Sequence, residues 1–273
     1  MFNPGHSNIL LSILLSPPRS GSTMLIRILN SHSRICSPCE ICLPYVVYKS
    51  AKYQKSIEKL RKICEYYQAP FPKLDIFLTW RVLAKKHLLN LAQAICKHEG
   101  KSALVIKDPR HAWYPERLEL MLASIAPKYI FLYRDVRGAV YSHYRLGRAS
   151  LDSAFDTWSE GTAKMLAFQA TLPSSRYIRV NYEDIITDSQ SVVKRIVEFL
   201  GFDFEPSILN YGSFQHSDDE MNLWSGEDMV TSAKIGLIDP MIATRWKDDA
   251  QLLQAYQDHA NAQQLNRQLG FDH

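Results

Sequence analysis

The chain has 273 residues, of which 46% are hydrophobic and 22% are charged. This composition is typical of a folded globular protein and excludes an intrinsically disordered one. The formal net charge of +4 is small, and the charges do not gather in runs. The sequence therefore gives no support to a nucleic-acid partner or to stable insertion into a membrane.

The N-terminal part contains one short apolar stretch, residues 9–15, which only Ser12 interrupts. This stretch is too short to span a bilayer, and neither a basic segment nor an Ala-x-Ala cleavage site accompanies it. We therefore expect a buried β-strand here and a cytoplasmic location.

Along the rest of the chain, short apolar runs alternate with longer segments of helical periodicity. This alternation is typical of α/β proteins with a parallel sheet. It predicts one domain over residues 1–273, in which helices flank a central parallel sheet. The expected strands are residues 9–15, 103–106, 129–133 and 177–180. The expected helices are residues 22–30, 80–98, 114–124, 136–145, 154–170, 189–200 and 249–269.

The segment at about residues 43–98 is too long for a simple crossover between the first two strands. Pro70 and Pro72 indicate a break within it, because the residue before a proline is biased away from the helical conformation. We expect a helical insertion that covers the functional site and helps to select the substrate.

The cysteine pattern argues against both a disulfide framework and a metal site. The count of five is odd, and no secretory signal is visible. Part of the pattern resembles a ligand run for zinc or an iron–sulfur cluster, but a fourth ligand at a suitable spacing is missing. We expect buried thiols and no metal. The five residues are Cys36, Cys39, Cys42, Cys64 and Cys96.

The loop after the first expected strand has the features of an anion-binding loop. Backbone N–H groups at the start of a helix favour an anion, and Gly21 permits close approach of the backbone. Arg19 adds a guanidinium that suits two phosphate or sulfate oxygens. The loop lacks the leading glycine and the lysine of a Walker A motif. The alternative is a serine-rich turn that merely caps the helix.

This loop resembles the 5′-phosphosulfate loop of sulfotransferases that use 3′-phosphoadenosine 5′-phosphosulfate (PAPS), especially the tyrosylprotein-type and bacterial branches. Cytosolic members have lysine where this chain has Arg19. The resemblance implies a three-layer P-loop-like fold, in-line transfer of a sulfuryl group from PAPS to a hydroxyl group, 3′-phosphoadenosine 5′-phosphate (PAP) as the product, and no required metal. The residues that carry it, and that would contact the donor, are Pro18, Arg19, Ser20, Gly21, Ser22 and Thr23.

A second motif resembles the family's 3′-phosphate site. Arg134 follows the expected strand 129–133, and Ser142 comes eight residues later on the expected helix. The two side chains can converge on one anion, because helical residues about seven apart return to one face, and Gly138 keeps the first helical turn open. The alternative is a strand-to-helix junction with solvated arginines.

The chemistry of transfer is assigned to four residues. Arg19 and Lys107 are candidates to stabilise the leaving group, since cations aimed at developing charge lower the barrier. Tyrosylprotein sulfotransferases have a similar Lys-Asp-Pro segment; the alternative is that Lys107 simply pairs with Asp108. Glu40 lies where those enzymes place their catalytic glutamate, and we expect it to be the base. His111 is the alternative candidate for the base, because cytosolic sulfotransferases use a histidine as the base.

Weaker similarities extend toward the C-terminus. Tyr182, in a Tyr-Glu-Asp segment, would lie against the nucleotide, whereas Glu183 would be structural. Lys234 or Arg245 would close on the 3′-phosphate, because residues 244–247 loosely resemble a late Arg/Lys-Trp element of the family.

Two other functions remain open at this point. The first is a P-loop nucleotide kinase or hydrolase, and the second is a non-catalytic module that binds adenosine phosphates. The acceptor is expected to be a small-molecule or carrier-bound hydroxyl compound, since the segment Ser37-Pro38-Cys39-Glu40 also resembles sulfotransferase domains of bacterial polyketide assembly lines. The sequence does not predict the oligomeric state.

Overall fold

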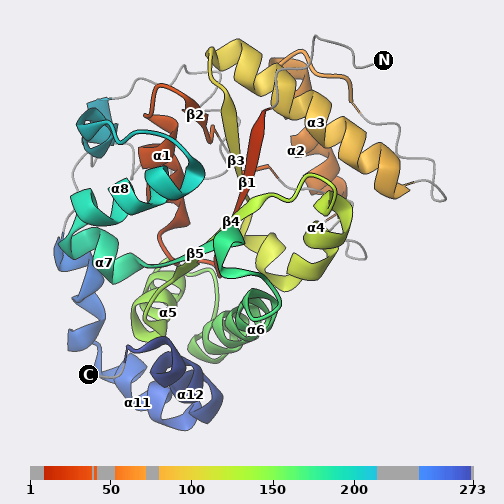
Figure 1. The fold of residues 1–273 in the computed structure, drawn as a ribbon. Helices are drawn as coiled ribbons and strands as arrows, with labels where there is room; N and C mark the ends of the chain where they lie inside the picture. Colours follow the sequence, from red (N-terminus) through yellow and green to blue (C-terminus); the bar gives the residue numbers. More distant parts are fainter. Residues whose placement is uncertain (1–8, 39, 42–52, 72–79, 214–239, 272–273) are drawn as a thin grey trace, which may run out of the picture.

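The computed structural model describes residues 9–38, 40–41, 53–71, 80–213 and 240–271. The strands in this part of the chain form one parallel sheet of order β2-β3-β1-β4-β5 (Figure 1). The predicted α/β fold with a central parallel sheet is confirmed. The strands are β1 (Leu10–Leu15), β2 (Ile35–Cys36), β3 (Ala103–Lys107), β4 (Lys128–Tyr133) and β5 (Tyr177–Asn181).

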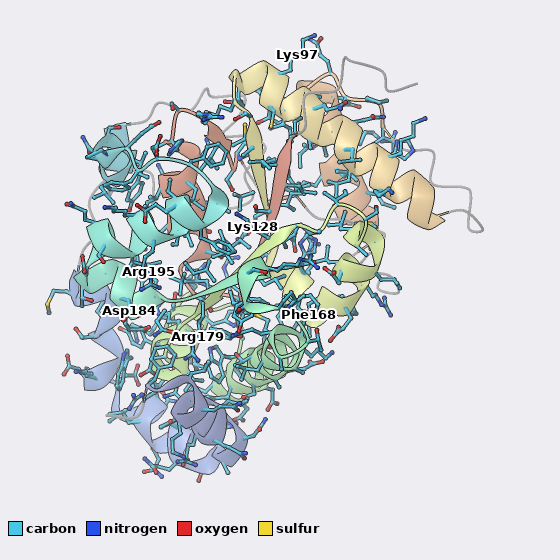
Figure 2. The ribbon with its side chains drawn as sticks, viewed as in Figure 1. Lys97, Lys128, Phe168, Arg179, Asp184 and Arg195 are labelled. Atoms are coloured by element: carbon cyan, nitrogen blue, oxygen red, sulfur yellow. The ribbon has the colours of Figure 1, made fainter. Side chains whose placement is uncertain are left out.

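The central strands are almost continuously apolar because helices cover both faces of the sheet. In β1, every residue from Leu11 to Leu15 is buried. Helices α1 and α8 lie on one side of the sheet, and α3, α4 and α6 lie on the other (Figure 1). Phe168 of α6 lies on the second side (Figure 2). Its ring packs edge-on against Tyr129, with ring centroids 5.1 Å apart.

The helices match most of the predicted ranges to within a few residues. They are α1 (Ser22–Asn30), α2 (Tyr53–Tyr66), α3 (Trp80–Glu99), α4 (Pro115–Leu122), α5 (Val136–Arg145), α6 (Leu151–Gln169), α7 (Tyr182–Thr187), α8 (Ser189–Leu200), α11 (Ala250–Asp258) and α12 (Ala260–Leu269). Short 3-10 segments are η1 (Pro109–Trp113), η2 (Ser174–Arg176), η3 (Pro206–Ser213), η4 (Pro240–Ala243) and η5 (Arg245–Asp248). None of the described helices is long and apolar enough to cross a membrane.

One predicted helix was wrong in its extent. The segment 249–269 is not continuous, because His259 leaves the helical conformation at φ −104° and ψ 68° between α11 and α12. The ring of His259 stacks on Phe155 of α6, with centroids 4.3 Å apart. This tertiary contact, which no local pattern reveals, accompanies the break.

The order of the strands gathers three loops at one edge of the sheet. From β1 the chain crosses past β3 to reach β2, whereas from β3 it crosses past β1 to reach β4. The connections thus diverge beside β1, and in open α/β sheets ligands bind in the crevice at such a switch point, outside the carboxyl ends of the strands. Arg19, Lys107 and Arg134 all lie at or just after the ends of these strands.

Candidate active site

The loop between β1 and α1 has an unusual backbone. Arg19 has φ 65° and Gly21 has φ 87°, and only glycine adopts this left-handed region without strain. Gly21 also occupies the cap position of α1 but offers no side-chain cap. The starts of α5, α6, α8 and α11, by contrast, are capped by their own Asp or Ser side chains. The start of α1 is therefore suited to an external anion.

Buried donor groups surround this loop. The hydroxyl groups of Ser16 and Ser20 and the Nε of Arg134 are buried, and none of them hydrogen-bonds to any residue that the structure describes. Buried polar groups normally have partners. These groups therefore fit a polar ligand with acceptor oxygens.

Hydrogen bonds join the two predicted phosphate motifs. Nη1 of Arg134 donates to the carbonyl oxygen of Arg19 at 2.9 Å. Nε of Arg19 donates in turn to the hydroxyl oxygen of Ser142 at 3.2 Å. The structure thus brings the start of α1 and the side chains of α5 to one place, although the sequence indicated them as separate motifs.

Tyr182 closes one side of the same place. The guanidinium of Arg134 lies over its ring at 4.2 Å from the centroid. A Cβ atom on Gly21 would lie 2.1 Å from Cδ2 of Tyr182, so only glycine fits there. A Cβ atom on Gly138 would lie 3.0 Å from Nε of Arg134. The two glycines therefore leave room for Tyr182 and Arg134.

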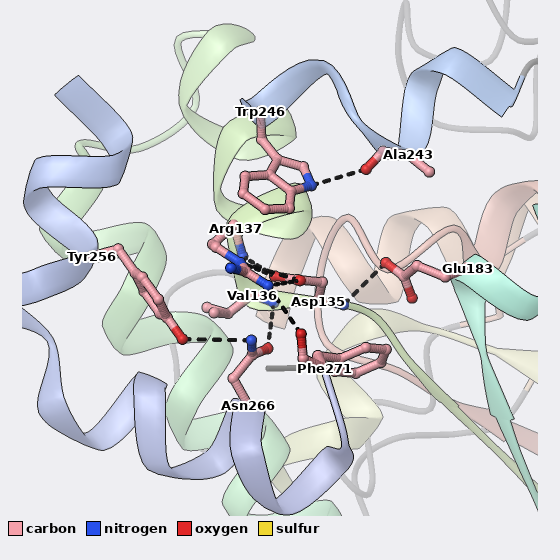
Figure 3. Close-up of polar contacts among 9 residues, drawn as sticks. All are labelled: Asp135, Val136, Arg137, Glu183, Ala243, Trp246, Tyr256, Asn266 and Phe271. Carbon is pink, nitrogen blue, oxygen red and sulfur yellow. Dashed lines mark hydrogen bonds and ion pairs between the residues drawn. The ribbon is translucent and has the colours of Figure 1, made fainter. Parts of the chain in front are cut away.

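The C-terminal helices hold the start of α5 in place (Figure 3). The Asp135 carboxylate accepts a hydrogen bond from the backbone N–H of Arg137 at 2.8 Å and pairs with the Arg137 guanidinium. From α12, Oδ1 of Asn266 accepts from the backbone N–H of Val136 at 2.9 Å. The guanidinium of Arg137 stacks on Trp246 at 4.2 Å from a ring centroid. The helix that carries Ser142 is thereby anchored at its N-terminus.

Glu183 supports the turn after Arg134. Its Oε1 accepts from the backbone N–H of Asp135 at 3.2 Å, and its buried Oε2 has no hydrogen-bond partner in the described residues. Burial raises the pKa of Glu183 to about 7, against the opposing effects of hydrogen bonds and of the Arg134 charge. Glu183 contacts the turn directly, as its predicted structural role requires.

Glu40 and Lys107 form an ion pair beside the loop. Nζ of Lys107 donates to Oε1 of Glu40, and the backbones of the two residues form a parallel bridge. Lys107 is 2% exposed and Glu40 is 25% exposed. Burial acts to raise the pKa of Glu40, but the positive charge of Lys107 and a smaller effect of Lys59 bring it below its ordinary value.

Asp108 does not take Lys107 as its partner. Its carboxylate instead accepts hydrogen bonds from the backbone N–H of Arg110 at 2.9 Å and from Nε of Arg110 at 2.7 Å. The alternative in which Lys107 merely pairs with Asp108 is therefore wrong. His111 is fully buried, and this burial lowers its pKa to about 4 despite the nearby Asp108 charge.

The remaining predicted residues divide into three groups. Ser22 is buried in the first turn of α1, and Pro18 and Thr23 are half-buried beside it. Arg245 is exposed on η5, next to the buried Trp246. Lys234 lies outside the described residues, as do Cys39 and Cys42 of the cysteine run, whereas Cys36 is a buried free thiol.

Lys59 is a site residue that sequence reasoning missed. Its Nζ lies 3.9 Å from Oε2 of Glu40. In the sequence it is one of several lysines on a polar helical segment, and no motif distinguishes it.

Comparisons with known proteins indicate the family and the fold of the chain. A model described as the sulfotransferase family matches residues 13–206. A Caenorhabditis briggsae protein described as a protein-tyrosine sulfotransferase is 23% identical over 239 residues, which cover 85% of this chain and 78% of the relative.

Solved structures of other sulfotransferases share the fold. The sulfotransferase domain of the Synechococcus PCC 7002 olefin synthase has a TM-score of 0.68 at 22% identity, covering 100% of this chain and 98% of that domain. The mouse sulfotransferase SULT7A1, solved in complex with PAP, has a TM-score of 0.50 at 12% identity, covering 96% of this chain and 90% of that one.

Proposed function

Because this chain belongs to the sulfotransferase family and carries out sulfuryl transfer, we propose that its donor is PAPS and its acceptor a hydroxyl group. The observation that carries the proposal is the pair of hydrogen bonds that join Arg134, Arg19 and Ser142. They unite two anion-binding motifs at one site, as a ligand with separate 5′ and 3′ phosphate groups requires.

The residues present fit such a donor. The start of α1 and the buried hydroxyl group of Ser20 would hold the 5′-phosphosulfate. Arg134 and Ser142 would hold the 3′-phosphate, and Tyr182 would line the nucleotide between them. The complex of mouse SULT7A1 with PAP supports PAPS as the donor. PAPS supplies an activated sulfuryl group bonded to a good leaving group.

In the proposed mechanism, each protein group acts on charge or on a proton. Arg19 and Lys107 stabilise the negative charge that develops on the departing phosphate. Glu40 accepts the proton of the acceptor hydroxyl group, since its carboxylate is the more exposed member of its pair with Lys107. Each cation contributes about 3 kcal/mol of barrier lowering, by analogy with oxyanion-hole donors.

Glu40 suits the role of base better than His111 does. The carboxylate is partly exposed, whereas the imidazole is fully buried beside Asp108. A base must come within hydrogen-bond reach of the acceptor, and the partly exposed carboxylate meets this condition more readily than the buried imidazole does. His111 is better placed to support the turn that follows β3.

The relatives indicate the chemical class of the acceptor. The Caenorhabditis briggsae relative described as a protein-tyrosine sulfotransferase supports a hydroxyl-bearing acceptor. The helical insertion at about 43–98 would cover this acceptor, and the contact of Lys59 in α2 with Glu40 supports that position.

A transfer assay with PAPS and a panel of phenolic and carrier-bound hydroxyl compounds tests the proposal. Glu40→Gln and Lys107→Ala should each reduce kcat by about 100-fold or more, whereas His111→Ala should retain most of the turnover of its folded fraction. Nearly full activity of Glu40→Gln together with an inactive, folded His111→Ala would reverse the assignment of the base. Magnesium-dependent ATP turnover in place of transfer would favour the kinase or hydrolase alternative.

A further inference from the structure

The carboxylate of Glu40 lies between two cations that come from different elements. Lys107, at the end of β3, donates to Oε1. Lys59, on α2, lies 3.9 Å from Oε2, and its side chain is 18% exposed. A second lysine of the same helix behaves differently, because Lys62 is 66% exposed and pairs at 4.0 Å with Glu58 on the helix surface.

Lys107 has two tasks in the proposed mechanism. It binds Glu40 in the structure, and it must also stabilise the leaving group during transfer. When its positive charge is shared with the leaving group, its hold on Glu40 weakens. A second cation on the other carboxylate oxygen would keep Glu40 oriented and ionised at that moment.

We propose that Lys59 is a positioning residue of this reaction, which holds Oε2 of Glu40 while Lys107 engages the leaving group. Lys59 thereby keeps the carboxylate ionised beside the acceptor hydroxyl group. This inference rests on the proposed role of Glu40 as the base.

In the part of the chain that the structure describes, charged groups from several elements act on Glu40. Lys107 of β3 and Lys59 of α2 favour the ionised carboxylate, whereas the negative charge of Asp108 after β3 opposes it. On η1, the neutral imidazole of His111 feels the charge of Glu40. Removing Lys59 would leave Lys107 as the one favourable charge among these groups, so Glu40 would lose its proton only at higher pH.

The test compares Lys59→Met, which keeps most of the length of the side chain without the charge, with Lys59→Arg, which keeps the charge. Lys62→Met is the matched control on the same helix, and Glu40→Gln identifies the base. For each variant, kcat/KM is measured from pH 3 to pH 9, because the pKa of Glu40 lies below its ordinary value. The pKa of Glu40 is also measured without ligand, by carboxyl-carbon NMR, with Glu40→Gln locating the resonance.

In Lys59→Met we expect the acidic limb of the kcat/KM profile to move to higher pH. The value of kcat/KM should fall by about tenfold on that limb and by less than about twofold on the alkaline plateau. The NMR titration should move in the same direction, and Lys59→Arg and Lys62→Met should resemble the wild type. An equal loss of kcat/KM at every pH in Lys59→Met would overturn the role of Lys59 but not the base assignment of Glu40. An unchanged pH profile in Lys59→Met, together with an inactive Glu40→Gln, would do the same. Nearly full activity of Glu40→Gln would overturn the inference and the base assignment together.

Discussion

Arg19 is the residue whose conformation most directly reflects the function of its loop. A residue with a Cβ atom in the left-handed region costs about 1–2 kcal/mol, and such strain persists where the surroundings enforce it. Here Arg134 enforces it by donating to the carbonyl oxygen of Arg19 at 2.9 Å. The strained residue is thus held by the same side chain that we assign to the 3′-phosphate.

Gly21→Ala should remove nucleotide binding, because the new Cβ would lie 2.1 Å from Cδ2 of Tyr182. Gly201→Ala is the matched control, since Gly201 also has a positive φ, 98°, but no atom of the described residues lies within 4 Å of the place that a Cβ would take there. Thermal unfolding and PAP titration are measured for both variants. The control should lose about 1 kcal/mol of stability and still bind PAP. Equal PAP affinities in the two variants would contradict the account.

Glu183→Gln should stabilise the protein more at pH 8 than at pH 5. Burial raises the pKa of Glu183 to about 7, from an ordinary value of 4.5. A carboxyl group with a raised pKa contributes stability below its unfolded value, and this contribution disappears as the pH rises through about 7. Gln keeps the Oε1 acceptor for the N–H of Asp135 but does not ionise.

Urea unfolding of wild type and Glu183→Gln at the two pH values measures this effect. Asp184→Asn, an exposed neighbour on the same helix (Figure 2), controls for the loss of a carboxylate charge. The same stability difference for Glu183→Gln at pH 5 and pH 8 would refute the prediction.

At the scale of elements, local signals explain which boundaries were predictable. Asp135 and Asp188 cap α5 and α8 with their side chains, and both helices begin where the sequence predicted. The apolar run of β1 likewise indicated a strand buried on both faces. The residues of these elements themselves contain the capping signal or the apolar pattern. Their boundaries could therefore be predicted without knowing which elements they pack against.

Elements that depend on distant partners were not predicted. β2 is two residues long and forms by pairing with β3, which lies more than sixty residues later in the chain. The separate helix α7 and the break at His259 were also missed. In the site, the motifs were evident but their contact was not, because Arg134 and Arg19 are 115 residues apart. Lys59 had no sequence signal, since only the fold brings it to Glu40.

The junction of α12 with α5 is an element-scale test of the donor site. Oδ1 of Asn266, a fully buried residue, accepts from the backbone N–H of Val136 at 2.9 Å. Asn266→Ala should destabilise the protein by about 1–3 kcal/mol, because that N–H loses its acceptor. PAP should also bind more weakly, since the start of α5 positions Arg134 and Ser142.

The control is Gln264→Ala, which changes an exposed residue of the same helix. Unfolding by urea and calorimetric titration with PAP are compared for the two variants. Wild-type stability and affinity in Asn266→Ala would show that α12 does not anchor the start of α5.

At the scale of the whole molecule, the sheet order gathers the site. The loops after β1, β3 and β4 come together because the chain crosses the sheet in opposite directions from β1 and β3. The donor residues come from β1–α1 and β4–α5, and the proposed catalytic pair joins the end of β3 to the segment after β2. The family resemblance and the switch point therefore indicate the same edge of the sheet.

The most direct test of this account is a calorimetric titration with PAP and with adenosine 5′-monophosphate. Wild type, Arg134→Ala and the control Arg195→Ala are compared, since Arg195 is an exposed residue on α8 (Figure 2). Wild type and control should prefer PAP by about 100-fold, because charge-assisted hydrogen bonds to the 3′-phosphate contribute about 1.5–3 kcal/mol each. Arg134→Ala should lose most of this preference, and its affinity for the monophosphate should fall by less than its affinity for PAP. Equal binding of the two nucleotides by wild type, or an unchanged preference in Arg134→Ala, would contradict the proposed donor site.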